Sequence, residues 1–315
     1  MQGRTKVVVA LVLVTLAALV GAACAPVTTN PPAGVTGPSP GCGTTTQDQV
    51  TDEARTLSVD GRSRRYTLTV PPQHTSGTTT PIPLVLDFHG LIEGSVGTHP
   101  FATQFSELAR TEGFAVAFPT GANDGFNWDV ALDEANPDLQ FIDELVAELG
   151  DTLCLDRSRV YITGLSFGAS MTSMLMCMRP NTFAAAAPVA GIRNPCTATE
   201  RKVPFVTFHG TADWILPYSL FEGVPQEIAR KYGCVDTPAA TSLGVDPGTG
   251  GEVTRFTWDC TAVDSAAEFY RIDNGGHSWP GSWFFGIIGF IVGPTTTELD
   301  ATEVIWEFFE RHQLD

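Results

Sequence analysis

The sequence predicts an α/β fold, a mostly parallel central sheet with helices on both faces. Strand-like and helix-like segments alternate along the chain from residue 42 onward, which is typical of parallel sheets with helical crossovers. Several strand-like segments are almost continuously apolar, as expected for strands buried on both faces. The 315 residues, 43% of them hydrophobic, are enough for one large domain.

The expected elements follow one another in a regular order. Residues 64–71 alternate like a strand, and residues 84–90 (LVLDFHG) form an apolar run. Helical spacing of apolar residues predicts helices, and short apolar runs predict further strands. The expected helices cover 105–113, 138–153 and 169–180, and the further strands cover 114–119, 159–164, 183–191 and 203–210.

The N-terminus has the pattern of an export signal. Residues 1–23 combine Arg4 and Lys6 with an apolar run that ends in small residues. The sequence GAAC at 21–24 resembles a bacterial lipobox and predicts lipidation of Cys24. The usual Leu is missing at Gly21, so a simply secreted form is the alternative. Residues 24–41 are rich in Pro, Thr and Gly and predict an extended tether, which leaves 42–315 as the catalytic domain.

Charge and cysteine content limit the partners and the compartment. The formal net charge of −17 argues against nucleic acid as a partner, and leaves a lipidated N-terminus as the expected contact with a membrane. An even number of cysteines in an exported chain predicts three disulfides, although counting alone leaves their pairing open. The cysteines are Cys42, Cys154, Cys177, Cys196, Cys234 and Cys260.

The segment YITGLSFGAS at 161–170 contains the pattern Gly-x-Ser-x-Gly around Ser166. A second copy, GPSPG at 37–41, lies among prolines with no strand before it and no helix after it. Ser166 instead lies between an expected strand and an expected helix. A tight turn there requires small neighbours, which Gly164 and Gly168 provide, and it presents the hydroxyl above the sheet edge. We therefore predict that Ser166 is a nucleophile.

A serine nucleophile needs an imidazole base and a carboxylate, which follow it in the order acid, then histidine, when it stands on this kind of turn. His277 lies in a glycine-bounded loop after a short strand, whereas His209 ends a strand and His312 lies near the C-terminus. Asp213 directly follows the strand 203–210. Its competitors lie in loops or at strand edges: Asp236, Asp259, Asp264 and Asp273. The predicted catalytic triad is Ser166, Asp213 and His277.

An oxyanion formed at Ser166 needs two backbone donors. The N–H of Phe167, directly after the nucleophile, is the first expected donor. The second is the N–H of Leu91, in the loop after strand 84–90, where Gly90 permits a close approach. This chemistry requires no metal and no organic cofactor.

The motifs LDFHG, GLSFG, VPFVTFHGTAD, NGGHSWPG and ELDATEVIWEFF together resemble the polyhydroxybutyrate depolymerase, feruloyl esterase and acetyl xylan esterase group of α/β-hydrolases. The resemblance extends from about Cys42 to the C-terminus. It implies the α/β-hydrolase fold, the same triad, and the disulfides Cys42–Cys154, Cys177–Cys196 and Cys234–Cys260.

The chain departs from this group at several positions. Phe167 and Trp214 replace smaller residues and are expected to crowd the apolar side of the pocket. The apolar run 283–292 follows the His277 loop and is either a buried strand or hairpin, or an apolar rim that contacts the substrate. The residues predicted to contact substrate are Trp128, Trp214, Trp279 and Phe284, and for Trp128 a position in the core is the alternative.

The function expected from the sequence is hydrolysis of carboxylic esters through an acyl-enzyme, on polyesters, acylated polysaccharides or small esters. A serine peptidase or amidase of the same fold is one alternative, because it would use the same triad. A cell-envelope binding lipoprotein without catalysis is another. The expected location is outside the cytoplasm, on the cell envelope or secreted.

Overall fold

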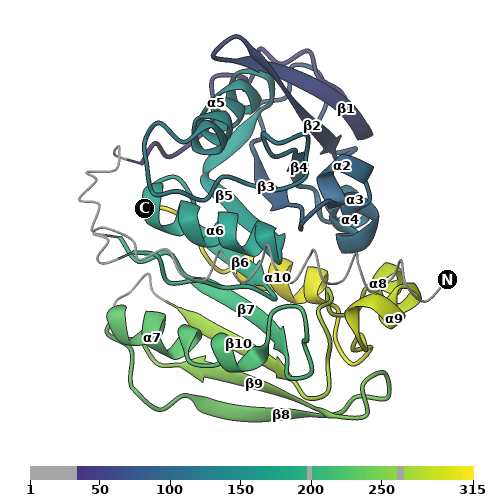
Figure 1. The fold of residues 1–315 in the computed structure, drawn as a ribbon. Helices are drawn as coiled ribbons and strands as arrows, with labels where there is room; N and C mark the ends of the chain where they lie inside the picture. The colour runs from purple at the N-terminus through teal and green to yellow at the C-terminus, as the bar shows by residue number, and fades with distance from the viewer. Residues whose placement is uncertain (1–33, 197–200, 261–265) are drawn as a thin grey trace, which may run out of the picture.

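The computed structural model describes residues 34–196, 201–260 and 266–315. The expected signal peptide, Cys24, residues 24–33 of the expected tether and Asp264 lie outside these residues. Within them, a single sheet of ten strands has the order β1-β2-β4-β3-β5-β6-β7-β10-β9-β8 (Figure 1). The strands are β1 (Val50–Val59), β2 (Arg62–Val70), β3 (Ile82–Phe88), β4 (Ala115–Pro119), β5 (Leu155–Leu165), β6 (Ala185–Val189), β7 (Phe205–Gly210), β8 (Ala239–Val245), β9 (Glu252–Trp258) and β10 (Ala267–Ile272).

The middle of the sheet is parallel and its two margins are antiparallel. Strands β4, β3, β5, β6, β7 and β10 are neighbours that run in one direction. The pairs β1–β2 and β2–β4 at one margin, and β10–β9 and β9–β8 at the other, are antiparallel. The loops after the central parallel strands therefore meet at one edge of the sheet.

Helices cover both faces of the sheet, which confirms the predicted fold class. Helices α5, α6 and α7 pack on one face, and α3, α4, α8, α9 and α10 pack on the other. The shorter α2 follows β3. The helices are α2 (Glu93–Val96), α3 (His99–Thr103), α4 (Phe105–Glu112), α5 (Pro137–Thr152), α6 (Phe167–Met178), α7 (Val224–Lys231), α8 (Trp283–Ile287), α9 (Gly289–Val292) and α10 (Ala301–Phe309).

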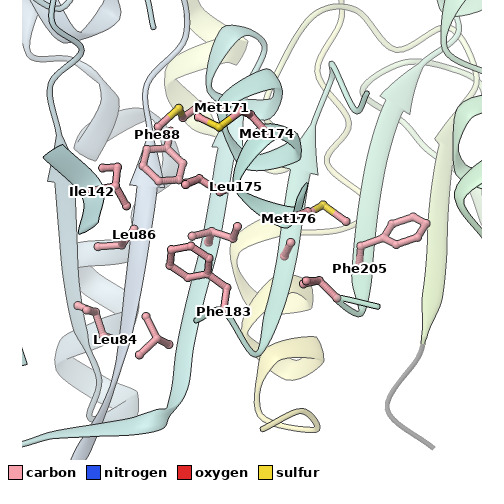
Figure 2. Packing of buried hydrophobic residues seen from close by; sticks show 14 of the residues in the cluster. Leu84, Leu86, Phe88, Ile142, Met171, Met174, Leu175, Met176, Phe183 and Phe205 are labelled. Atoms are coloured by element: carbon pink, nitrogen blue, oxygen red, sulfur yellow. The ribbon is translucent and has the colours of Figure 1, made fainter. Parts of the chain in front are cut away.

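Alternation along the central strands explains their continuously apolar sequences. In β5, Val160 and Ile162 enter the core beneath α5 and α6, whereas Tyr161 enters the core on the other face. Figure 2 shows the core beneath α5 and α6, in which Phe88 lies near the methionines of α6. Each strand residue thus buries apolar surface against one of two helical layers.

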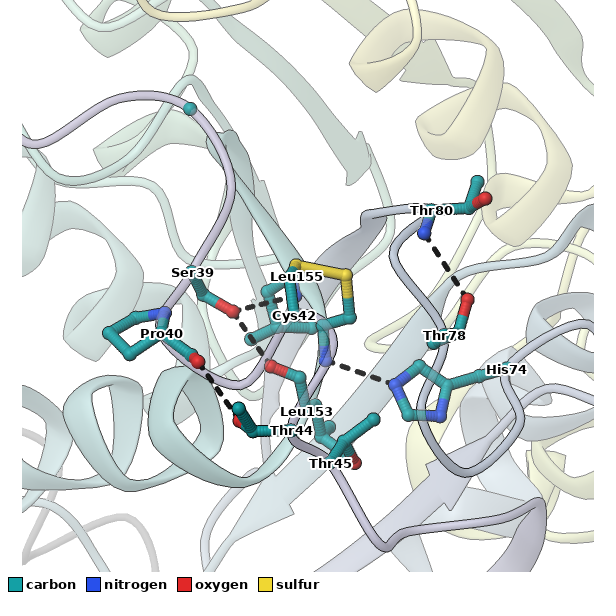
Figure 3. Close-up of a disulfide and its surroundings, with 12 residues drawn as sticks. Ser39, Pro40, Cys42, Thr44, Thr45, His74, Thr78, Thr80, Leu153 and Leu155 are labelled. Atoms are coloured by element: carbon teal, nitrogen blue, oxygen red, sulfur yellow. Dashed lines mark hydrogen bonds between the residues drawn. A yellow bond between two sulfur atoms is a disulfide. The ribbon is translucent and has the colours of Figure 1, made fainter.

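The folded domain begins before Cys42, where the tether was expected to end. Ser39 is buried; its Oγ donates to Leu153 O at 2.7 Å and accepts from Leu155 N at 2.9 Å. The Gly41 N–H donates to Gly150 O. Figure 3 shows the two hydrogen bonds of Ser39 beside the disulfide between Cys42 and Cys154. The serine of the second Gly-x-Ser-x-Gly copy is therefore a structural residue.

The three disulfides are Cys42–Cys154, Cys177–Cys196 and Cys234–Cys260, the pairing that the resemblance implied. Disulfides of this number form and persist in oxidising compartments outside the cytoplasm. Among the described residues, no helix is both long and apolar enough to cross a membrane.

The sequence missed the margins of the sheet. Strands β1 and β8 are mostly exposed, β9 mixes buried and partly buried residues, and none of the three has the apolar run of a central strand. The run 283–292 forms α8 and α9 and is neither a strand nor a β-hairpin. Gly286 and Gly289 interrupt this run, and its apolar content alone did not distinguish a strand from two helical turns.

Candidate active site

Ser166 occupies a strained turn between β5 and α6. Its backbone has φ 59° and ψ −110°, a conformation that L-residues rarely adopt. The Ser166 N–H donates to Val189 O of the neighbouring strand β6 at 2.9 Å. Ser166 is 7% exposed, and its Oγ makes no hydrogen bond to any residue that the structure describes. This is the geometry of a nucleophile elbow, as the sequence predicted.

The glycines beside Ser166 permit close contact between the turn and the end of β3. A Cβ on Gly168 would lie 1.9 Å from Phe88 O, and a Cβ on Gly164 would lie 2.6 Å from the same atom. Atoms this close would clash with backbone that cannot rotate away. The contact places the loop after β3 next to the turn, since a Cβ on Gly90 would lie 3.5 Å from Leu165 O.

Asp213 and His277 form a short hydrogen bond at the same edge of the sheet. His277 Nδ1 lies 2.7 Å from Asp213 Oδ2, and both side chains are buried. The two loops are joined by a hydrogen bond from Ala212 N to Gly275 O. Because Nδ1 donates to the carboxylate, Nε2 of a neutral His277 carries the free lone pair that a general base needs.

Asp213 is held as an anion. Burial alone would raise the pKa of Asp213, but the charge of His277 and hydrogen bonds from His209 and His277 outweigh burial and hold that pKa well below its usual range. Asp213 Oδ1 also accepts from the N–H groups of Ile215 and Leu216. Four donors therefore surround the carboxylate.

His209 supports the turn that carries Asp213, as its sequence position indicated. Its Nε2 lies 3.0 Å from Leu216 O and 3.3 Å from Asp213 Oδ2. Its ring stacks on Phe221, with a distance of 5.1 Å between ring centroids. His312, near the C-terminus, is partly buried against Phe308, and burial lowers the pKa of His312 to about 4.

The described competitors of Asp213 have other partners. Asp236 pairs with Arg230, and Asp273 pairs with Arg271. Asp259 contributes its backbone carbonyl, which accepts from Val235 N.

Neither of the two expected oxyanion donors has a hydrogen-bond acceptor within the described part of the chain. Phe167 is the first residue of α6, where a backbone N–H has no acceptor inside the helix. Leu91 follows Gly90, and its N–H makes no hydrogen bond within the described part of the chain. Both N–H groups are thus available to a ligand at this edge.

His89 orients the peptide that carries the Leu91 N–H. Gly121 N donates to His89 Nε2 at 3.0 Å, so His89 Nδ1 carries the proton and donates to Gly90 O at 2.7 Å. In a trans peptide, the Gly90 C=O and the Leu91 N–H point in opposite directions. Burial lowers the pKa of His89 to about 4 and keeps this tautomer neutral.

Two tryptophans expected to contact substrate are structural. Trp128 is 2% exposed; its Nε1 donates to His89 O at 2.9 Å. Trp279 is 1% exposed and donates to Thr302 Oγ1. Both are corrected to core residues, because neither offers surface to a ligand. The side chain of Phe167 is also in the core rather than in the pocket, whereas Trp214 is 41% exposed.

Helices α8 and α9 form an exposed apolar projection attached to the His277 loop. The His277 N–H donates to Val292 O at 2.6 Å. Phe285 is buried and Phe284 is half-buried, so they anchor the projection. We call the exposed apolar side chains of this projection the apolar rim: Trp283, Ile287, Phe290 and Ile291.

The ordered strands, the elbow and the Asp–His pair define a hydrolase of the α/β-hydrolase fold. The profile of the prolyl oligopeptidase family matches residues 103–214. Feruloyl esterase D of Neurospora crassa is 27% identical over 289 residues, 87% of this chain and 90% of that protein. Feruloyl esterase C of Emericella nidulans is 26% identical over 276 residues, which are 86% of this chain and 90% of that protein.

A solved structure, the acetyl xylan esterase from Aspergillus awamori, has the same fold. It superposes with a TM-score of 0.58 at 16% identity over 76% of this chain and 99% of that chain. Together with the sequence relatives, it makes this chain an esterase-like α/β-hydrolase, which confirms the predicted resemblance.

The turn at Gly168 gives a direct stability prediction. We expect Gly168→Ala to lower the free energy of unfolding by about 3 kcal/mol, the upper end of the cost of overpacking, because the new methyl group meets the Phe88 carbonyl. Gly286→Ala is the matched control, since a Cβ there meets nothing within 4 Å. Denaturant unfolding measures both, and equal stabilities would contradict the steric argument.

Proposed function

We propose that this protein is a serine carboxylic ester hydrolase that removes acyl groups from acylated polysaccharides. The observation that carries the proposal is the short Asp213–His277 hydrogen bond at the sheet edge that also presents Ser166 on its strained turn. The names of the relatives, feruloyl esterases, support ester hydrolysis. A further relative named as a bifunctional acetylxylan esterase/xylanase supports an acylated polysaccharide as the substrate class.

In the proposed mechanism, His277 Nε2 takes the proton of Ser166 Oγ as the oxygen attacks the ester carbonyl. The Leu91 and Phe167 N–H groups stabilise the oxyanion of the tetrahedral intermediate. The intermediate collapses when His277 returns the proton to the leaving alcohol, which leaves an acyl-enzyme. Water, deprotonated by His277, then releases the acid. Asp213 stabilises the imidazolium in both steps.

Replacing the nucleophile tests the mechanism. We expect Ser166→Ala to lower kcat for p-nitrophenyl acetate and methyl ferulate by on the order of 10⁶-fold, without loss of stability. Ser39→Ala, at the other Gly-x-Ser-x-Gly copy, is the matched control. It should keep kcat but lose about 1–3 kcal/mol of stability, because buried backbone groups lose their partner.

The outcomes of this experiment separate the alternatives. Ester hydrolysis that survives in Ser166→Ala would mean that another group attacks. Faster cleavage of p-nitroanilides than of p-nitrophenyl esters would favour a peptidase or amidase, the alternative consistent with the match to the prolyl oligopeptidase family. Specific binding without turnover, unchanged in Ser166→Ala, would favour a binding lipoprotein.

The apolar rim is the proposed contact for the acyl group. The backbone of α9 is hydrogen-bonded to the base, and Phe290 next to that contact is 86% exposed. Isolated exposed apolar residues are common, but four on one short projection form a patch typical of a binding surface. Of the four residues that the sequence predicted to contact substrate, Phe284 and Trp214 have accessible surface and stay in this proposal.

Removing the rim should affect large acyl groups selectively. We expect Ile287→Ser and Phe290→Ser to raise KM for methyl ferulate by about 10-fold, the effect of losing one apolar contact, while KM for p-nitrophenyl acetate changes little. Val245→Ser on edge strand β8, with 69% exposure at Val245, is the control. Equal changes of KM for both esters, or no change for either, would contradict the proposal. If the variants instead lose only the hydrolysis of an insoluble polyester, the substrate is a polyester.

We also propose that Cys24 carries a lipid that anchors the exported domain. The basic start, the apolar run and the small residues before Cys24 support this proposal. In a bacterial host, Cys24→Ser should move the protein from the membrane fraction into the medium, whereas Ser166→Ala should remain in the membrane fraction. Wild-type protein found entirely in the medium would contradict it.

A further inference from the structure

A buried charged network lies behind the loop after β3, separate from the triad. His99 of α3 contacts two carboxylates: its Nε2 lies 2.8 Å from Asp87 Oδ1, and its Nδ1 lies 3.2 Å from Glu93 Oε2. Asp87 Oδ2 also accepts from Thr103 Oγ1 at 2.6 Å. Asp87 is fully buried and His99 is 2% exposed. No motif in the sequence distinguished Glu93 or His99.

Two carboxylate partners require a proton on each ring nitrogen, so His99 is an imidazolium. Burial alone would lower the pKa of His99, but Asp87 and Glu93 outweigh burial and raise that pKa to about 10. Burial would likewise raise the pKa of Glu93, but hydrogen bonding to His99 and the charge of His99 lower it. The network therefore holds the His99 cation between the carboxyl groups of Asp87 and Glu93.

The network reaches the proposed oxyanion loop through a single backbone group. The Gly90 N–H donates to Glu93 Oε2 at 2.6 Å, the same oxygen that faces His99. On the other side, the Gly90 C=O accepts from His89. Gly90 is thus held at both its N–H and its C=O, and the next N–H along the chain is that of Leu91.

We propose that Glu93 and His99 are positioning residues for the oxyanion loop: Glu93 holds the Gly90 N–H, and the His99 cation offsets part of the Glu93 charge beside the site where the oxyanion forms. The inference rests on the proposed function, because it assigns the Leu91 N–H to that oxyanion. Asp87, on β3, orients the His99 ring through its contact with His99 Nε2.

The positive charge of His99 affects the stability of the oxyanion as well as the position of the loop. A carboxylate is the strongest acceptor for the Gly90 N–H, but an unpaired carboxylate one peptide away would repel a developing oxyanion. The imidazolium beside Glu93 reduces that repulsion while the hydrogen bond remains. Loss of His99 should therefore weaken transition-state binding, and loss of the Glu93 charge should reverse part of that effect.

Single variants test the positioning role. We expect Glu93→Ala to lower kcat for p-nitrophenyl acetate by about 10²-fold, the size of the effect when one oxyanion donor is lost, with KM nearly unchanged. Glu93→Gln keeps an acceptor oxygen and should recover most of kcat. Glu107→Gln, at an exposed carboxylate of α4, is the control. Equal losses in Glu93→Ala and Glu93→Gln, or a rise in KM alone, would overturn the role of the acceptor.

The double variant tests the charge. His99→Asn should lower kcat by about 10-fold to 10²-fold, and adding Glu93→Gln should restore part of that loss because the uncompensated charge is gone. Losses that add or deepen in the double variant would overturn the role of His99, since two merely structural defects would not compensate each other.

A measurement without turnover separates this inference from the proposed function. Hydrogen exchange of the peptide that contains Gly90 should be faster in Glu93→Ala than in wild type, and close to wild type in Glu93→Gln. If wild type hydrolyses no ester, the proposed function fails, while exchange still decides whether Glu93 holds the loop. Unchanged exchange in Glu93→Ala would overturn the inference even if ester hydrolysis is confirmed.

Discussion

The contact between the turn after β5 and the carbonyl end of β3 is the constraint on which the rest of this site depends. At Gly164 and Gly168 the turn lies so close to Phe88 O that a side chain at either position would clash with this oxygen. Within this turn Ser166 has its strained backbone conformation, and Gly90 after β3 lies beside Leu165 before the turn. Packing of one strand end against one turn thus brings the proposed nucleophile and the proposed oxyanion loop together.

On both sides of this contact, buried charged side chains are paired with hydrogen-bond donors or with groups of opposite charge. On the β7–β10 flank, a buried aspartate receives hydrogen bonds from two histidines and two backbone N–H groups. On the β3 flank, a buried histidine lies between two carboxylates, one of which holds the backbone of Gly90. Each buried charge has a partner of opposite sign or an oriented donor, which is the condition under which buried charges are tolerated.

The tryptophans illustrate where sequence patterns lose their information. Trp128 and Trp279 lie next to site motifs in the chain, yet both rings are buried and both indole N–H groups have acceptors inside the protein. An aromatic residue beside a catalytic loop can face either the core or the cleft, because both environments are apolar. The exposed apolar surface instead lies on α8 and α9, whose glycine-interrupted run carries no clear period.

The sequence by itself determined the order of the central strands and helices, the elbow at Ser166, the candidates Asp213 and His277, and the even set of cysteines. These features depend on local periodicity, on glycine at a tight turn and on chain order, all of which are visible in one dimension. The tertiary structure alone decided which aromatic rings are buried, that Ser39 is bound to the Leu153 and Leu155 backbone, and that Glu93 lies between the Gly90 N–H and His99. Those properties arise from contacts between segments brought together by the sheet, and no local pattern encodes such distances.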